Sequence, residues 1–406
     1  MLLANRHAGR GPYPANLQQV MNIGQARASR RSLAQWDLLA PAPTPVWPLS
    51  NLARELGIGA IGIKDESARS PLGSFKVLGA PVALLRLIQR RSPHWSDDDL
   101  LAGRHAGALG ELVVISATDG NHGRALAAAA RSIGCRCVIV LHAQVSAERE
   151  QAIAALGARI VRVAGNYDAS VREAARLALA NGWQVVSDTS YEGYEEIPRD
   201  VMQGYAVLAD EVLEQVEPAA PCPYTHVFLQ GGVGGLAAGV ASYFWERFGA
   251  MRPVIVVVEP EQADCLLQSC RSGAPARASG SVDSVMAGLA CGEASPLAWR
   301  FLQPAVDFFQ TVGDDEATRA MRVLAQGSAG DVPVVAGESG AAGLAGLLAL
   351  VRDPAQRRQA GLDAASRVLL FNTEGATAPA LYASLAEVGA PEVLQAQREW
   401  LRRQRA

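Results

Sequence analysis

The sequence has very little lysine. Of its 37 lysine and arginine residues, only Lys64 and Lys76 are lysines, which leaves 35 arginines. A guanidinium group stays protonated in proteins, whereas a lysine amine can lose its proton and attack a carbonyl group. Lys76 lies in GSFKVLGA (73–80), a stretch with no acidic residue to pair with, although lysine is normally solvated or paired. We therefore interpret Lys76 as a candidate nucleophile, with chance retention on a helix surface as the alternative.

Other absences exclude whole classes of protein. A net charge of -3 lacks the basic excess that a nucleic-acid binder shows. Six cysteines with no CxxC pair argue against a disulfide scaffold and a zinc site, so we expect no metal. No uninterrupted apolar run approaches the length of a membrane span, and MLLANRHAGRGPYPA has too short an apolar stretch for a signal peptide. We therefore expect a cytoplasmic protein that binds neither nucleic acid nor membrane.

The remaining composition is that of an ordinary globular chain, with 49% hydrophobic and 19% charged residues. Runs rich in valine and isoleucine alternate with alanine- and arginine-rich helical stretches, which is typical of a parallel sheet flanked by helices. One block has predicted strands at 112–116, 135–141, 159–165 and 183–188, and a second begins with strands at 225–230 and 254–260. The predicted fold is α/β with two domains, each an open, mostly parallel sheet flanked by helices.

The stretch VFLQGGVGGLAAGV (227–240) reads as strand, glycine loop and helix. Backbone N–H groups of such a loop can converge on a phosphate, and the dipole of the following helix favours its charge. The residues expected to bind the phosphate are Gly231, Gly232, Val233, Gly234 and Gly235. We expect a bulkier residue at Gly234 to weaken cofactor retention more than folding, because the loop must approach the phosphate closely.

The same loop also fits a dinucleotide fingerprint. Gly232, Gly234 and Ala237 match the required spacing, and Glu259 lies at the end of the next predicted strand, where a ribose-binding acid would lie. A nicotinamide-dependent oxidoreductase that uses the GGVGGLAAG loop is therefore an alternative of another class. A third interpretation is that the glycines only allow close packing of helix on strand.

A second loop, SATDGNHG (116–123), also leaves a strand and opens a helix. It carries side chains that can hold a polar ligand such as a substrate carboxylate: Ser116 and Thr118 donate hydrogen bonds, Asn121 donates or accepts, and Asp119 can take a proton. Asp119 has an alternative role as the N-cap of the helix. His122 is interpreted as a residue that supports the ligand-binding side chains or packs, rather than as a ligand, since no second histidine lies at metal-ligand spacing.

A third loop, SDTSYEGYEEIPRDVMQGY (187–205), begins at the carboxyl end of a predicted strand, where open α/β sheets bind ligands. Asp188 is therefore a candidate catalytic or substrate-binding residue, and capping the following turn is an equally good local explanation. Glu338 and Ser339 in GESGAAG, and Thr373 in FNTEGAT, are polar residues at element ends that we expect near the same site.

A lysine in GSFK, an asparagine in DGNHG and a later glycine loop, in this order, resemble fold type II pyridoxal phosphate enzymes, the tryptophan-synthase-like class. The resemblance extends from KDESARS (64–70) to FNTEG. Within that class, TDGNHGRALA, SDTSYEGYEEIPRDVMQGY, GVGGLAAG and NTEGAT are similar to the diaminopropionate ammonia-lyase family. The resemblance implies a lyase that eliminates ammonia from 2,3-diaminopropionate and releases pyruvate and two molecules of ammonia, and a homodimer.

The resemblance also implies how the chain is divided. Residues 1–87 and 204–406 would form a large cofactor-binding domain and residues 88–203 a small substrate-side domain, with the cofactor in the cleft between them. Lys76 would hold pyridoxal 5'-phosphate as a Schiff base, Asn121 would hydrogen-bond the ring hydroxyl and Thr373 would face the ring nitrogen. The glycine loop would hold the phosphate.

The implied chemistry assigns roles to the two aspartates. Lys76, once displaced by the substrate amine, would remove the α-proton from one face, and Asp119 would serve the opposite face for the other enantiomer. Asp188 or Asp119 would pair with the extra β-ammonium of the substrate, which a hydroxy amino acid lacks. Another fold type II activity, such as a serine or threonine dehydratase, a β-replacement enzyme or a racemase, stays open, as does a catalytically idle cofactor-holding protein.

Overall fold

The computed structural model describes residues 1–118, 120–143, 145–165, 167–216 and 221–405, and its main strands form two sheets. The larger sheet has seven strands, in which the neighbours from β10 to β3 run parallel and the edge strands β1 and β2 run antiparallel. Their order is β1 (Leu2–Ala4), β10 (Phe308–Val312), β9 (Val254–Pro260), β8 (His226–Gln230), β11 (Arg367–Asn372), β3 (Ala60–Asp65) and β2 (Val46–Pro48).

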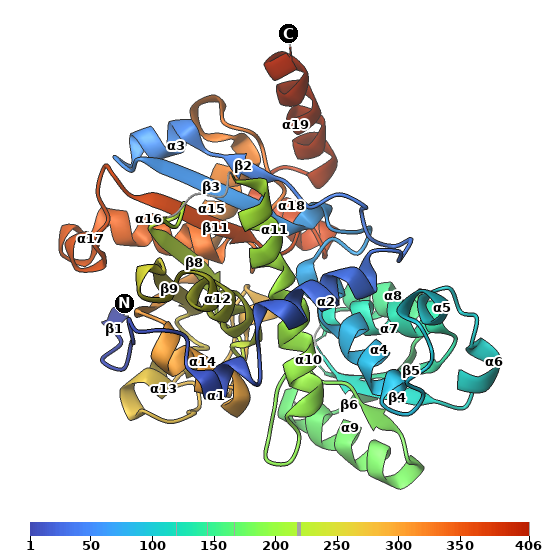
Figure 1. Cartoon of the computed structure of the whole chain (residues 1–406). Helices are drawn as coiled ribbons and strands as arrows, with labels where there is room; N and C mark the ends of the chain where they lie inside the picture. The colour runs from blue at the N-terminus through green and yellow to red at the C-terminus, as the bar shows by residue number, and fades with distance from the viewer. Residues whose placement is uncertain (119, 144, 166, 217–220, 406) are drawn as a thin grey trace.

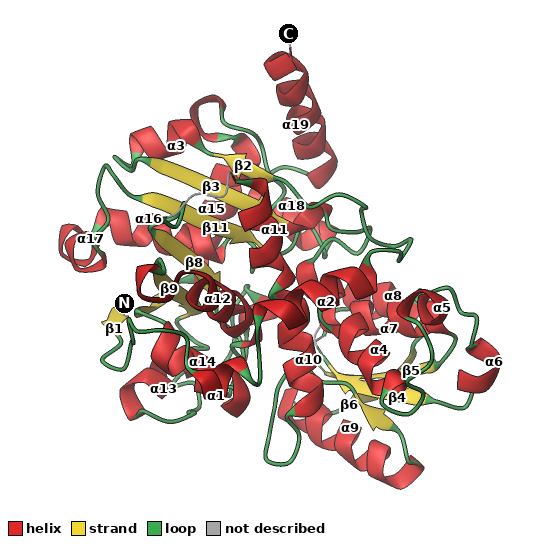
Figure 2. Cartoon of the chain, in the orientation of Figure 1, coloured by secondary structure: helices red, strands yellow, loops and turns green. Residues whose placement is uncertain are grey.

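The smaller sheet has four strands, all parallel. Their order is β6 (Arg159–Val163), β5 (Arg136–His142), β4 (Val113–Ala117) and β7 (Gln184–Val185). Every residue of β4 is buried, as expected of a central strand covered on both faces. Figure 2 shows the two sets of strands apart from each other, each with helices around it.

Helices connect and cover the strands (Figure 1). The α-helices are α1 (Ala15–Gln18), α2 (Ile23–Leu33), α3 (Ser50–Glu55), α4 (Ala80–Gln89), α5 (Asp97–Leu101), α6 (Ala106–Leu109), α7 (Asn121–Ile133), α8 (Ala147–Ala154), α9 (Tyr167–Asn181), α10 (Glu196–Tyr205), α11 (Val207–Gln215), α12 (Gly235–Phe248), α13 (Cys265–Ser272), α14 (Pro296–Ala305), α15 (Asp314–Gln326), α16 (Ala342–Arg352), α17 (Pro354–Ala360), α18 (Pro379–Ala386) and α19 (Ala390–Arg405). Short 3₁₀ turns are η1 (Glu66–Ala68), η2 (Phe75–Leu78), η3 (Gly249–Met251), η4 (Ala287–Leu289) and η5 (Ser328–Gly330). Within the described residues, none of these helices combines the length and the apolar character that a membrane span needs.

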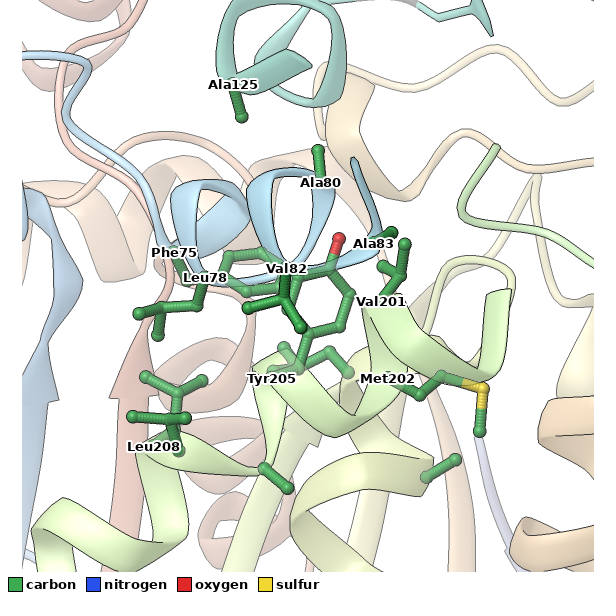
Figure 3. Close-up of a cluster of buried hydrophobic side chains, with 14 of the residues drawn as sticks. Phe75, Leu78, Ala80, Val82, Ala83, Ala125, Val201, Met202, Tyr205 and Leu208 are labelled. Atoms are coloured by element: carbon green, nitrogen blue, oxygen red, sulfur yellow. The ribbon is translucent and has the colours of Figure 1, made fainter. Parts of the chain in front are cut away.

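The two halves are joined by packed helices. In Figure 1, α10 and α11 lie between the two sets of strands. Figure 3 shows Val201 and Tyr205 of α10 against Leu78 and Val82, which belong to η2 and α4. One buried apolar cluster includes these residues and continues into α7 on one side and α12 on the other. The lysine motif therefore lies where both halves meet, in a rigid apolar setting.

The predicted α/β fold is confirmed, and each strand expected from the sequence is present, although the last of the first block is shorter than predicted. Only Gln184 and Val185 form β7; the Val186 N–H still donates to the Ile115 carbonyl oxygen at 2.9 Å before the chain turns. The strands of the small sheet lie within the predicted small domain, and those of the large sheet lie outside it. The boundaries at 87/88 and 203/204 stay predictions, and they fall inside the paired helices α4 and α10.

Candidate active site

Lys76 lies in η2, directly before α4. The Phe75 N–H donates to the Thr373 carbonyl oxygen at 3.0 Å, which ties this segment to the end of β11. Nζ of Lys76 donates to Oδ2 of Asp188 at 2.5 Å, and the two side chains are 19% and 14% exposed. The candidate nucleophile therefore has an acidic partner, and that partner comes from the third predicted loop rather than from its own stretch.

Charge pairing sets the ionisation of this site. Burial by itself would lower the pKa of Lys76, but the Asp188 charge, together with Tyr205 and the hydrogen bond to Asp188, raises that pKa above its ordinary value. Burial also opposes the ionisation of Asp188, yet the Lys76 charge, and after it His122, holds the pKa of Asp188 well below its usual range. The amine is therefore held as an ammonium in the cofactor-free protein, and it must lose a proton before it can attack a carbonyl group.

His122 lies next to Asp188. Its side chain is buried, with Nδ1 3.9 Å from Oδ2 of Asp188 and Nε2 2.9 Å from the Val186 carbonyl oxygen. Burial lowers the pKa of His122, so the ring is neutral at pH 7. His122 also lines the cavity, and its Nδ1 has no hydrogen-bond partner among the described residues, so its supporting or packing role stays a prediction.

Tyr205 forms the wall beside Lys76. Its ring centroid is 4.6 Å from that of Phe75 and 5.6 Å from Nζ of Lys76. This close approach requires glycine on both sides: a Cβ on Gly79 would lie 2.7 Å from Cζ of Tyr205, and one on Gly204 would lie 2.8 Å from the Leu78 carbonyl carbon. The Tyr205 hydroxyl is buried and has no hydrogen-bond partner among the described residues.

The second predicted loop lies at the end of β4 and opens α7. Thr118 and Asn121 line the same cavity as Lys76 and Asp188, whereas Ser116 is fully buried on β4 and is not among the lining residues. Thr118 accepts a hydrogen bond at Oγ1 from the Gly120 N–H at 3.3 Å. Asp119 lies outside the described residues, so its predicted catalytic and substrate-binding roles stay predictions.

The glycine loop presents a restricted set of amides. The Gly231 N–H donates to the Val258 carbonyl oxygen at 2.9 Å, and the Gly234 N–H donates to that of Gly231 at 3.2 Å. Within the described part of the chain, the N–H groups of Gly232, Val233 and Gly235 have no such partner, and these three residues line the cavity. Free amides beside the start of α12 suit a phosphate, so the geometry supports the predicted cradle.

Gly234 has a different requirement. Its φ of +100° is a conformation that residues with a side chain rarely adopt, and an added Cβ would lie 2.7 Å from Cδ1 of Leu302. Gly234 is also not a lining residue. A larger residue at this position would strain the fold before it reached the cavity, which weighs against the expectation drawn from the sequence.

Glu259 does not serve a dinucleotide. Its side chain is fully buried, and its two carboxylate oxygens accept the Leu266 and Leu267 N–H groups at 2.8 Å each, where α13 begins. Burial raises the pKa of Glu259 to about 8. A carboxyl group committed to a helix start cannot also bind a ribose, so the geometry weighs against the nicotinamide alternative.

Two buried acids lie on the side of the large sheet. Glu338 accepts from Nη2 of Arg149 at 2.7 Å, which connects α8 to the GESG segment. Burial, and then repulsion from Glu374, raises the pKa of Glu338 to about 7. Glu374 accepts from Nδ2 of Asn121 and from the Ser339 N–H, the latter at 3.2 Å. Glu338 therefore binds α8, and Glu374 binds the start of α7 and the GESG segment.

The Lys76–Asp188 pair, Thr118 and Asn121, part of the glycine loop and Glu374 line one cavity, whose volume of about 1100 Å³ includes open solvent at its mouth. Thr373 lines it, as predicted from its place in FNTEGAT. The sequence analysis missed several lining residues. Some lie inside strings quoted from the sequence without an assigned role, namely Tyr205, Glu374, Arg124 and Gln230, while Arg149, Tyr167 and Cys291 carry no local signal. An amine, a set of free amides and an asparagine amide around one cavity fit an aldehyde cofactor that bears a phosphate.

Comparison with known proteins places these features in context. The chain matches the family model described as pyridoxal-phosphate dependent enzyme over residues 38–374. It is 40% identical over 341 residues to the diaminopropionate ammonia-lyase of Escherichia coli (strain K12), an alignment that covers 82% of this chain and 85% of that relative. It is also 40% identical over 354 residues to the same enzyme of Salmonella typhimurium (strain LT2), with 84% of this chain and 87% of that relative covered.

A solved structure agrees. The Escherichia coli diaminopropionate ammonia lyase, in complex with an aminoacrylate-PLP azomethine reaction intermediate, matches this structure with a TM-score of 0.85 at 34% identity. The match covers 95% of this chain and 96% of that chain. The similarity therefore spans both sheets and the cavity between them.

Proposed function

The chain belongs to the diaminopropionate ammonia-lyase family of pyridoxal-phosphate dependent enzymes, and we propose that it converts 2,3-diaminopropionate and water into pyruvate and two molecules of ammonia. The observation that carries the proposal is the Lys76–Asp188 pair, which lies in one cavity with the free amides of the glycine loop. This combination supplies an attacking amine, an anion to control its proton and a site for a phosphate.

The cavity has the groups that pyridoxal phosphate needs. Lys76 would carry the cofactor covalently, and Gly232, Val233 and Gly235 would hold its phosphate through backbone N–H groups. Asn121 would hydrogen-bond the ring oxygen, and Thr373 would face the ring nitrogen. When bound, the pyridoxal ring withdraws the electron pair that is left on the substrate α-carbon when its proton is removed.

The residues of the chain would then manage protons and charge. Lys76, released by the substrate amine, would take the α-proton at Nζ, and Asp119 would take it from the opposite face for the other enantiomer. Asp188 is placed to hold the proton on Nζ of Lys76 while the cavity is empty. With the amine covalently engaged, the same carboxylate would pair with the β-ammonium of the substrate, which leaves as ammonia.

One carboxylate of the cavity, that of Asp188, would favour this substrate over serine. A diaminopropionate β-ammonium gains from a nearby carboxylate, whereas the serine hydroxyl gains much less. A dehydratase or a racemase of the same fold would use the lysine and the phosphate cradle equally well. The substrate therefore has to be tested directly.

The decisive experiment is a scan of D- and L-amino acids with the purified holoenzyme, measuring keto-acid and ammonia release. We expect pyruvate and two equivalents of ammonia from diaminopropionate, at rates well above those with serine or threonine. Release of keto acid from serine or threonine but not from diaminopropionate would contradict the proposal and indicate a dehydratase. Borohydride should abolish the visible absorbance of the lysine-bound cofactor; bound nicotinamide in its place would indicate an oxidoreductase.

The assembly and location of the protein are also proposals. We infer that the chain forms a homodimer and acts in the cytoplasm, where small amino acids are its partners. Light scattering coupled to size-exclusion chromatography would check the first point. Cell fractionation would check the second.

A further inference from the structure

Glu374 lies beside the lysine segment although it is 298 positions away from Lys76 in the sequence. It follows β11, and its backbone pairs with that of Ser74 in an antiparallel bridge. Next to it, the Gly375 N–H donates to the Gly73 carbonyl oxygen at 2.9 Å. The backbone of Glu374 is therefore fixed relative to the candidate nucleophile, and its side chain can act as a rigid reference point.

The GESG segment is shaped around this residue. The Glu374 side chain is 4% exposed, and Oε1 accepts the Ser339 N–H at 3.2 Å. A Cβ on Gly337 would lie 3.1 Å from Cγ of Glu374, and one on Gly340 would lie 2.5 Å from its carbonyl oxygen. Gly337 and the Ser339 amide therefore make room for the carboxylate and bind it, while Gly340 allows close approach to the backbone of the same residue.

The other carboxylate oxygen, Oε2, accepts from Nδ2 of Asn121. An asparagine amide has two ends of similar size and opposite polarity, so its shape does not decide which end faces a ligand. A carboxylate can only accept, so Glu374 can bind only the NH₂ end. The NH₂ group has two hydrogens, and with one bound to Glu374 the second stays free to donate to a ligand in the cavity.

We propose that Glu374 is a positioning residue that fixes the amide of Asn121 so that Nδ2 donates to the ring oxygen of the cofactor. The inference rests on the proposed function, which makes Asn121 a cofactor contact. A donor at this point stabilises the ionised ring oxygen, and an amide turned by half a rotation would oppose it with a carbonyl oxygen. Glu338, the neighbouring buried acid, accepts from Arg149 and makes no hydrogen bond with Asn121 among the described residues.

The test uses the purified protein with and without cofactor. Glu374→Gln keeps the size of the side chain but leaves only one oxygen to accept from the Asn121 amide and the Ser339 N–H. Glu374→Ala removes both acceptor oxygens. We expect both to weaken cofactor affinity, by about 10- to 100-fold as for residues that orient metal ligands. We also expect the absorbance of the holoenzyme to shift from the visible band toward the near ultraviolet, because the ring oxygen loses its donor. Equilibrium dialysis and absorbance measure these two effects.

Glu338→Gln is the matched control, because it neutralises a buried acid nearby and should leave the spectrum unchanged. Thermal unfolding of each cofactor-free variant reports whether it is folded, and if Glu374→Ala is not, Glu374→Gln carries the test. In an Asn121→Ala background, Glu374→Gln should cause no further loss of affinity, since the two residues act as one unit. Additive losses, or a wild-type spectrum and affinity in the folded Glu374 variants, would overturn the inference.

The outcome is separable from that of the proposed function. A protein that shows the spectral shift but never releases pyruvate from diaminopropionate supports the role of Glu374 and contradicts the lyase assignment. If the protein releases pyruvate from diaminopropionate but its Glu374 variants keep the wild-type spectrum, the lyase assignment is supported and the role of Glu374 is contradicted.

Discussion

The Lys76–Asp188 pair should contribute measurably to the stability of the cofactor-free protein. Nζ and Oδ2 are 2.5 Å apart, and the side chains are 19% and 14% exposed. Removing one partner of a fully buried pair costs about 3–5 kcal/mol, because the other charge is left uncompensated. With the partial exposure observed here, we expect Lys76→Met and Asp188→Asn each to lower the free energy of unfolding by about 2 kcal/mol. The double variant buries no unpaired charge, so it should be no less stable than either single variant.

Urea unfolding of the four cofactor-free proteins at pH 7 measures this coupling through a double-mutant cycle. The pH dependence of the coupling energy gives a second test. The pKa of Asp188 is lowered by folding, so its contribution is present above the unfolded pKa of about 3.9 and is lost as the pH falls through the folded value. The pKa of Lys76 is raised, so its contribution is present below about 10.4 and is lost as the pH rises through the folded value. The coupling should therefore be constant between about pH 5 and pH 9.

Additive losses from the two substitutions would refute this reasoning. A coupling energy within about 0.5 kcal/mol of zero would mean that Lys76 and Asp188 do not attract each other measurably in solution. Asp188 would then be free for the substrate from the start, and the proposed control of the lysine proton would have no physical basis.

Three further predictions concern the same site. Lys76→Arg keeps the charge but should abolish the visible absorbance of the bound cofactor and nearly all pyruvate release, and normal turnover would contradict the nucleophile assignment. Gly79→Ala should lower the free energy of unfolding by about 1–3 kcal/mol in urea, because the new methyl overlaps Tyr205 and Val201; in a Tyr205→Ala background the loss should be smaller, because only the overlap with Val201 remains. Asp119→Asn should keep the cofactor spectrum yet slow turnover of the D-isomer more than that of the L-isomer. An equal loss of turnover for both isomers would argue against Asp119 as an opposite-face base.

Much of the fold could be predicted from the sequence because its signals are local. The valine-rich run that became β9 is buried along almost its whole length, so its composition alone was sufficient evidence. The glycine loop was recognisable for the same reason, since a strand, closely spaced glycines and a helix follow one another without interruption. The resemblance of the motifs then supplied the cofactor and the family, which the comparisons confirm.

Long-range pairings could not be predicted in this way. The partner of Lys76 lies 112 positions away, and that of Asn121 lies 253 positions away. No periodicity or spacing encodes such contacts, because they depend on how two sheets are placed against each other. Gly234 shows the same limit: its place in the motif suggested contact with a phosphate, whereas its own surroundings are Leu302 and Ala298.

The pairing of FKVLG with MQGY has a steric cause. Gly204 and Gly79 leave no side chain between α10 and η2, so the Tyr205 ring can pack directly on the lysine turn. Any larger residue at either position would push α10 outward, and Tyr205 with it. The apolar ring beside Nζ would then give way to solvent, which weakens the attraction between Lys76 and Asp188 because charges interact less strongly in water than in a protein interior. Two glycines that contact no substrate therefore help to set the ionisation of the lysine, because they determine how closely a buried ring approaches it.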